Sequence, residues 1–136
     1  MTALSDSVYQ IGIYNDYFLI GSGTVPDYTL CNWYGPKRIE VWEGITEIGT
    51  ACISGVELLT TVTLPVSLQV IGDGSFYRND LLEHVYYAGT REQWAMVSAS
   101  ESVKASLESV LVCADEEGYL PGITTPVFKR NTRGYS

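Results

Sequence analysis

Hydrophobic and polar positions alternate in short runs along this chain, and this pattern favours short strands over long helices. Residues 8–22, VYQIGIYNDYFLIGS, hold two β-rich runs around Asn15 and Asp16. Both residue types tolerate left-handed backbone angles, so the segment predicts a β-hairpin. Residues 23–37 contain two prolines, several turn-forming residues and bulky aromatics, which predict an irregular connector.

The central part of the sequence repeats with a period of 23 residues. Shifted by that number, IEVWEGITEIGTACISGVELLT (39–60) falls on VTLPVSLQVIGDGSFYRNDLLE (62–83), and the apolar positions keep their phase. A third copy begins at residues 85–87 and then diverges. This period is typical of leucine-rich repeats, in which each unit is a short strand followed by a turn or an irregular return.

The second copy shows how one unit is expected to fold. Val62 and Leu64 alternate with polar residues, which directs one face of a short strand inward. Ile71 ends a second apolar ridge, and Gly72 permits a tight turn or a close backbone approach. Phe76 then fills the space between units. Since no unit buries its apolar edge alone, neighbouring units must stack and both ends need caps.

The Gly-x-Gly at residues 72–74 follows a strand, as the phosphate loop of a dinucleotide site does. However, Gly72 has its counterpart in Gly49, and Gly74 aligns with Ala51, which has no phosphate-binding role. A dinucleotide loop also needs a third glycine where Tyr77 stands and a long helix afterwards. The motif therefore predicts a structural corner of the repeat.

After the third strand, Thr90 to Gln93 form a capping box that starts a short helix. A second helical piece is expected at 101–107 and a strand at 109–113, and together they predict a terminal cap. Residues 119–136 hold two prolines and no periodicity, which predicts a tail or an arm that orders against a partner.

The expected fold is mainly β: a short leucine-rich-repeat solenoid of two to three repeats. We expect an N-terminal β-hairpin and connector cap over residues 1–38, the repeats with a small helical C-terminal cap over 39–113, and an extended tail or arm over 114–136.

The segments ITEIGTACI, LPVSLQVIGDGSF and VYYAGTREQWAMV resemble the BspA-like leucine-rich repeats, and the resemblance covers about residues 17–113. Proteins with these repeats occur on the surfaces of gut and oral bacteria, in some protozoa and in the phages of such bacteria. The resemblance implies a binding or structural role without catalysis.

Charge and composition narrow the function classes. Hydrophobic residues make up 46% of the chain, which excludes a disordered protein. Sixteen acidic against eight basic residues give a net charge of −8, so the body repels phosphate backbones and we expect no nucleic-acid partner. Three of the basic residues, Lys129, Arg130 and Arg133, lie in the last eight positions. No secretory signal and no apolar stretch of about 20 residues is visible, so we expect no membrane partner.

No pattern of catalytic or metal-binding residues stands out, so we expect neither an enzyme nor a cofactor. The three cysteines have spacings that fit neither a disulfide framework nor a zinc site, which favours free thiols and a reducing cytoplasm. His84 is expected on the outer face of a strand. The acidic residues Glu40, Glu43 and Glu47 are expected to form a solvated face.

Aromatic residues are the candidate contacts for a partner. Trp42, Tyr77, Tyr86 and Tyr87 lie at or near strand positions, where exposed aromatics bind protein or sugar, although some of them must enter the core of so small a domain. The tail adds Phe128 and the three basic residues named above.

We expect a structural or attachment protein of a large assembly that contacts other subunits or copies of itself. A phage virion decoration, fibre or tail component assembled in the host cytoplasm fits best. The alternative is an adhesin-like module at the bacterial cell surface that binds host protein or glycan.

Overall fold

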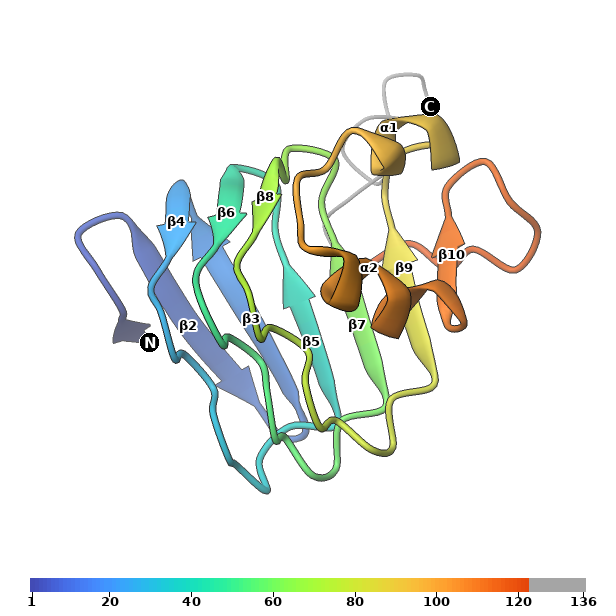
Figure 1. Cartoon of the computed structure of the whole chain (residues 1–136). Helices are drawn as coiled ribbons and strands as arrows, with labels where there is room; N and C mark the ends of the chain where they lie inside the picture. Colours follow the sequence, from blue (N-terminus) through green and yellow to red (C-terminus); the bar gives the residue numbers. More distant parts are fainter. Residues whose placement is uncertain (123–136) are drawn as a thin grey trace, which may run out of the picture.

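A computed structural model describes residues 1–122 as two facing β-sheets with two short helices at one end (Figure 1). Within these residues, the large sheet contains, in spatial order, β1 (Thr2–Ala3), β2 (Val8–Ile13), β3 (Asp16–Gly21), β5 (Arg38–Val41), β7 (Thr61–Leu64), β9 (His84–Tyr87) and β10 (Leu111–Cys113). The small sheet contains β4 (Gly23–Val25), β6 (Ile45–Ile48) and β8 (Val70–Ile71). The helices are α1 (Arg91–Ala95) and α2 (Glu101–Glu108).

The predicted N-terminal hairpin is confirmed, with its turn one residue earlier than expected. Strands β2 and β3 pair antiparallel, and Ile13 lies opposite Asp16. The loop is therefore Tyr14 and Asn15, and Tyr14 has a left-handed φ of 57°. Asp16 belongs to β3, where its carboxylate forms an ion pair with Arg38 at 3.2 Å.

Strand pairing confirms the 23-residue repeat, because residues 23 positions apart lie opposite each other in both sheets. In the large sheet, Ile39 pairs with Val62 and Val62 with Val85, all in parallel. In the small sheet, Ile48 pairs with Ile71 at the same spacing. Each unit thus forms one coil of the chain, with one strand in each sheet and the apolar side chains between them.

The prediction of an irregular connector over 23–37 is wrong for residues 23–25, which form β4, whereas residues 26–37 consist of turns, bends and one isolated bridge between Cys31 and Ser54. Strand β4 pairs in parallel with β6, and β3 pairs in parallel with β5 through Tyr17 and Ile39. Residues 16–37 therefore form an additional coil, followed by coils at 38–60 and 61–83. Residues of β3 pair with residues of β5 that lie 22 positions later in the sequence. A register shift between Gly23 and Thr24 brings this offset to 23 residues from Thr24 onward. This change of spacing hid the coil from the sequence comparison.

The segments that return from the small sheet to the large one, residues 26–37, 49–60 and 72–83, form what we call the return edge. Three alternate residues of each segment have a left-handed φ, at equivalent positions in all three coils. These positions are Tyr28, Ala51 and Gly74; Leu30, Ile53 and Phe76; and Asn32, Gly55 and Arg78. A left-handed non-glycine residue costs about 1–2 kcal/mol, so other interactions must hold this conformation.

Backbone hydrogen bonds between coils supply that stabilisation. The amide of Ala51 donates to the carbonyl of Asp73 in the following coil at 2.8 Å, and the amide of Ile53 donates to Thr29 in the preceding coil at 2.9 Å. The amide of Gly55 again donates to the following coil, to the carbonyl of Tyr77 at 2.9 Å. The return edge therefore satisfies its backbone polar groups without forming regular strands.

Buried side chains reinforce the contacts between coils. Asn79 is 8% exposed; its side-chain oxygen accepts from the amide of Val56 at 2.9 Å, and its amide donates to the carbonyl of Ile53 at 2.6 Å. Ser75 donates from Oγ to the carbonyl of Gly49 at 2.9 Å. In the preceding coil Cys52 stands at the position of Ser75 and directs Sγ to the carbonyl of Pro26 at 2.9 Å. Burial raises the pKa of the Cys52 thiol to about 11.

The C-terminal cap matches its prediction. Thr90 accepts from the amide of Gln93, whose side chain accepts from the Thr90 amide, so the capping box is formed. Trp94 of α1 is 2% exposed, and α2 buries Val103 and Leu107 in the core between the sheets. The cap closes the apolar end of the last coil.

An ionic cluster ties the cap together. Arg91 donates from Nε and Nη2 to the two carboxylate oxygens of Glu116 at 2.7 and 2.8 Å, and from Nη1 to Glu108 at 3.1 Å. The hydrogen bonds from Arg91, together with one from the Cys113 amide, lower the pKa of Glu116 to about 2.

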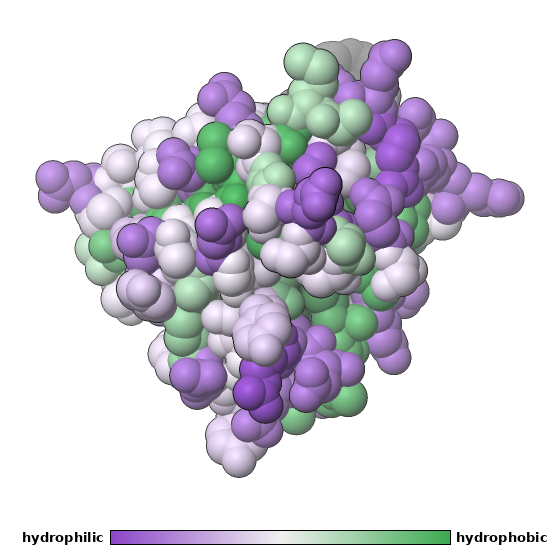
Figure 2. All heavy atoms as spheres, in the orientation of Figure 1, coloured by the Kyte–Doolittle hydropathy of each residue, from purple (hydrophilic) through white to green (hydrophobic). Residues whose placement is uncertain are grey.

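The surface over the small sheet carries polar and apolar side chains intermixed (Figure 2).

Two glycines of one corner are expected to respond differently to alanine. A Cβ on Gly72 would lie 2.6 Å from backbone atoms of Gly49, so Gly72→Ala must push two coils apart and should destabilise by roughly 3 kcal/mol. A Cβ on Gly74 would meet nothing closer than 3.7 Å, and its counterpart Ala51 already has a φ of 53°, so Gly74→Ala should cost only the left-handed penalty of about 1–2 kcal/mol. Urea unfolding measures both, and equal losses would contradict this account.

Phe76 is expected to act as a core residue between coils. Its side chain is 4% exposed within the core cluster, so Phe76→Ala should lower the free energy of unfolding by about 3–5 kcal/mol. A loss below about 1 kcal/mol would mean that the coil does not pack in this register. Val66→Ala, at a 37% exposed position, is the control in the same denaturant series.

Protonation of Glu116 at low pH should destabilise the C-terminal cap. Since its folded pKa of about 2 lies below the ordinary value of about 4.3, its contribution to stability is full above the ordinary value and is lost as the pH falls toward 2. Carboxyl NMR titration should show this low pKa, and Arg91→Gln should move it back toward the ordinary value. A Glu116 that titrates normally in the unaltered protein would contradict the ion pair.

Candidate functional site

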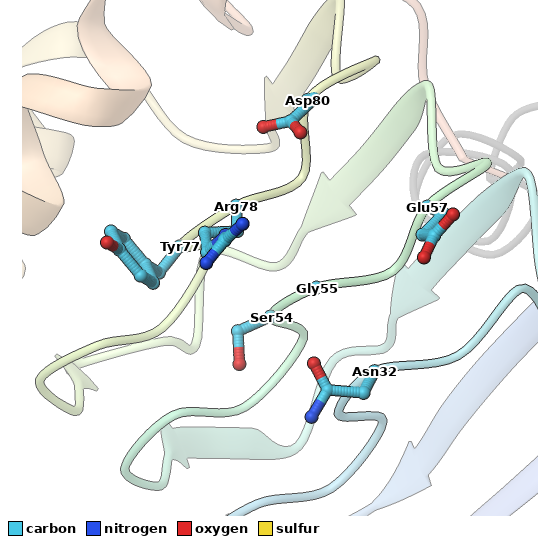
Figure 3. Close-up of a pocket in the computed structure, with 7 residues that line it drawn as sticks. All are labelled: Asn32, Ser54, Gly55, Glu57, Tyr77, Arg78 and Asp80. Carbon is cyan, nitrogen blue, oxygen red and sulfur yellow. The ribbon is translucent and has the colours of Figure 1, made fainter.

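A hollow of about 500 Å³ opens on the return edge, and equivalent positions of successive coils form it (Figure 3). Asn32, Gly55 and Arg78 occupy one position in the three coils, and Glu57 and Asp80 occupy another. Ser54 and Tyr77 complete its lining. Carboxylates, a guanidinium and a phenol ring therefore surround one concave surface.

The glycine in the middle coil lets the Asn32 side chain pack closely at this hollow. Gly55 has a left-handed φ of 66°, and a Cβ on it would lie 2.4 Å from Oδ1 of Asn32. Asn32 therefore occupies the place that a side chain at position 55 would take. None of the ion pairs within residues 1–122 involves Arg78, which leaves its guanidinium available to a partner.

Large apolar and aromatic side chains are exposed around this hollow. Tyr77 is 65% exposed, and it directly precedes Arg78 in the lining. The other exposed members on the return edge are Tyr28, Trp33, Tyr34, Leu58 and Leu81. Leu58 and Leu81 occupy equivalent positions of consecutive coils, so part of this surface repeats with the fold.

The predicted partner contacts fall into different environments. Tyr77 lies on the hollow, as described. Trp42 is half-buried on the large sheet, where its indole N–H donates to Glu40 at 3.2 Å. Tyr86 is 6% exposed and lies between His84, stacked at 5.6 Å between ring centroids, and Tyr119, edge-on at 6.1 Å. Phe128, Lys129, Arg130 and Arg133 lie outside the described residues.

The expectation of an exposed Tyr87 is wrong. Successive side chains of a strand point to opposite faces, so Tyr86 and Tyr87 cannot both face outward. Tyr87 is the inward one: it is 1% exposed and packs edge-on against Trp94 at 5.4 Å. It is therefore a core residue that no partner reaches.

The expectation of a solvated face at Glu40, Glu43 and Glu47 is also wrong for one member. Glu40 is 1% exposed and forms an ion pair with Nη1 of Arg38 at 2.6 Å, whereas Glu43 is exposed. His84, by contrast, lies exposed on the outer side of its strand, as expected. The burial of Glu40 needs a covering segment, which the sequence did not reveal.

The described part of the chain offers little for metal or redox chemistry. Among residues 1–122, no three His, Cys, Asp or Glu side chains gather in a way that would hold a metal ion. Cys52 and Cys113 are buried free thiols, and Cys31 is partly exposed. None of the helices described here is long and apolar enough to cross a membrane.

Sequence reasoning placed the candidate contacts on the sheet and missed most of the candidate site, which lies on the return edge. Asn32 and Arg78 occupy equivalent positions there, but Asn32 belongs to the coil at 16–37. Alignment of that coil with the next two would have placed Asn32, Gly55 and Arg78 together. The left-handed φ values that bring these residues together leave no simple apolar pattern in the sequence.

Comparison with known proteins supports the fold class. The chain matches no family model and no curated protein. The crystal structure of a leucine-rich repeat protein from Eubacterium ventriosum ATCC 27560 superposes with a TM-score of 0.58 and 25% sequence identity, over 71% of this chain. The match spans only 26% of that protein's length. This chain therefore has a leucine-rich-repeat type of fold that is mainly β with few helices.

Proposed function

We propose that this protein is a non-enzymatic protein–protein interaction module whose contact surface is the return edge around Tyr77 and Arg78. The observation that carries the proposal is the gathering of exposed aromatic and apolar side chains beside a polar hollow on one edge of the molecule. Tyrosine and arginine are the residue types that most often dominate the energy of protein interfaces.

The construction of this edge supports the same function. Hydrogen bonds between coils fix its backbone, so binding does not have to order the main chain of this edge. The carboxylates of Glu57 and Asp80 line the hollow, and the next residues in sequence, Leu58 and Leu81, are exposed. The surface therefore offers charged groups and apolar area side by side, and protein interfaces contain both.

The stacked coils also agree with the more specific proposal of a short leucine-rich-repeat solenoid that acts inside a large assembly. A virion component and an exported adhesin remain the two proposed settings for it. Mass spectrometry of purified particles and of cell-envelope fractions from the source would distinguish them, because the chain should be enriched in one fraction only.

Site-specific photo-crosslinking tests the proposed surface. A photoreactive phenylalanine analogue at Tyr77 should crosslink a protein of the native source, whereas the same analogue at Tyr14, which is 97% exposed on the hairpin turn, should not. For the captured protein, Tyr77→Ala and Arg78→Ala should each weaken binding about tenfold or more, equivalent to about 1.4 kcal/mol.

Tyr14→Ala is the matched control for these variants and should leave the affinity unchanged. Crosslinks that form equally from both positions, or an affinity that neither return-edge variant alters, would contradict the proposal.

A further inference from the structure

The outer face of the large sheet is buried although neither helix contributes to covering it. Phe18, Glu40, Thr63 and Tyr86 pair with one another across β3, β5, β7 and β9 and form what we call the outer row. Their strand neighbours Leu19, Ile39, Val62 and Val85 point into the core, so the outer row points away from it. All four outer-row residues are at most 6% exposed.

Trp42 and Arg38 cover Phe18 and hydrogen-bond to Glu40, and the chain after β10 supplies the cover over Thr63 and Tyr86. Tyr119 packs edge-on against Tyr86 at 6.1 Å, and Leu120 and Pro121 share a hollow with Thr63 and Tyr86. Gly122 is buried, and a Cβ on it would lie 2.9 Å from Oε1 of Glu40 and 3.1 Å from Cγ2 of Thr63. Within four residues the segment thus moves from β9 to β5 across the strands. Figure 1 shows the same segment looping out after β10 and turning back toward β9.

The described segment ends against β5, and the direction of its path leads on to β3 and β2. Phe18 is the next member of the outer row, and Ile11 pairs with Phe18 beyond it. The two strand spacings from β5 to β2 amount to about 10 Å, which about three extended residues cross. The fourteen residues after Gly122 are therefore long enough to cover the rest of this face.

The composition of this last part of the chain fits the face. Residues 123–136 contain Phe128 and three basic side chains and no acidic one, whereas all sixteen acidic residues precede them. Ile11 and the 53% exposed Ile13 provide apolar area on β2, and Asp16, with its side chain 40% exposed, provides a carboxylate. The basic segment and the carboxylate of Asp16, which also forms an ion pair with Arg38, carry opposite charges that attract each other.

We propose that residues 119–136 dock on the outer face of the large sheet of their own chain, so that this face is an intramolecular peptide-binding surface occupied by the C-terminal segment. Burial and the charge of Glu40 both raise the pKa of the Tyr119 phenol, which agrees with a position between the segment and the sheet. The proposal does not depend on the return edge, which lies on a different side of the coils.

Hydroxyl-radical footprinting of the full chain tests the described contact. In the unaltered protein Tyr86 should be protected and Tyr77 reactive. Gly122→Leu should raise the oxidation rate of Tyr86 severalfold, because the new side chain collides with Glu40 and Thr63. Glu117→Leu is the matched control, since Glu117 is exposed and precedes the segment, and it should leave Tyr86 protected.

Tyr87 reports whether the fold is intact in every variant, because it lies on the inner face next to Tyr86. A protected Tyr87 with a reactive Tyr86 supports displacement of the segment alone. A Tyr86 that stays protected in both Gly122→Leu and Tyr119→Ala would overturn the proposal.

Carbodiimide crosslinking of a mixture of ¹⁵N-labelled and unlabelled full-length chains tests the remaining residues and the identity of the occupant. Lys129 should crosslink to carboxylates of the outer face, Asp16 above all, and each crosslinked peptide pair should carry a single isotope. Mixed-isotope pairs would show that a second copy supplies the segment and would overturn docking within one chain. The absence of outer-face crosslinks would overturn it as well.

Discussion

Hydrogen bonding from the backbone of one coil to the backbone of the next is the constraint on which the rest of the structure depends. In the sheets it takes the form of parallel strand pairs, and at the return edge it continues through residues with left-handed φ. The unfavourable conformation of Ile53 or Phe76 is stable only because the neighbouring coil accepts and donates at matching positions. Once the coils pair in this way, the position of each apolar side chain between the sheets is fixed.

This constraint also decides where side chains are available for binding. Successive side chains of a strand point to opposite faces of the sheet. Tyr87 therefore lies in the core, and Tyr86 lies on the outer face against Tyr119. The return edge has no such alternation, and its corners direct long side chains such as Tyr77 outward. The return edge thus provides a concave surface that is open to a partner.

The sequence predicts the repeat well because the apolar residues keep the same spacing in both copies although few residues are identical. The parallel strands of the second and third coils, the capping box at Thr90 and the role of Gly72 as a structural corner all follow from that phase or from local rules. The coil at 16–37 was missed, since its spacing is one residue shorter in the large sheet and prolines interrupt it. The burial of Glu40 was missed for a different reason: besides Arg38 and Trp42, it lies against Gly122, eighty-two positions later, and no local pattern carries that information.

The register shift between Gly23 and Thr24 shows how a chain of this kind can change in evolution. A coil that is one residue short still pairs correctly on both sheets, because the small sheet absorbs the difference before the return edge begins. Duplication of a whole coil would preserve every contact between neighbours, whereas a deletion inside the return edge would move all the left-handed positions out of step. Genes for such proteins are therefore expected to vary in length by entire units, and by single codons only at the entrance to the small sheet.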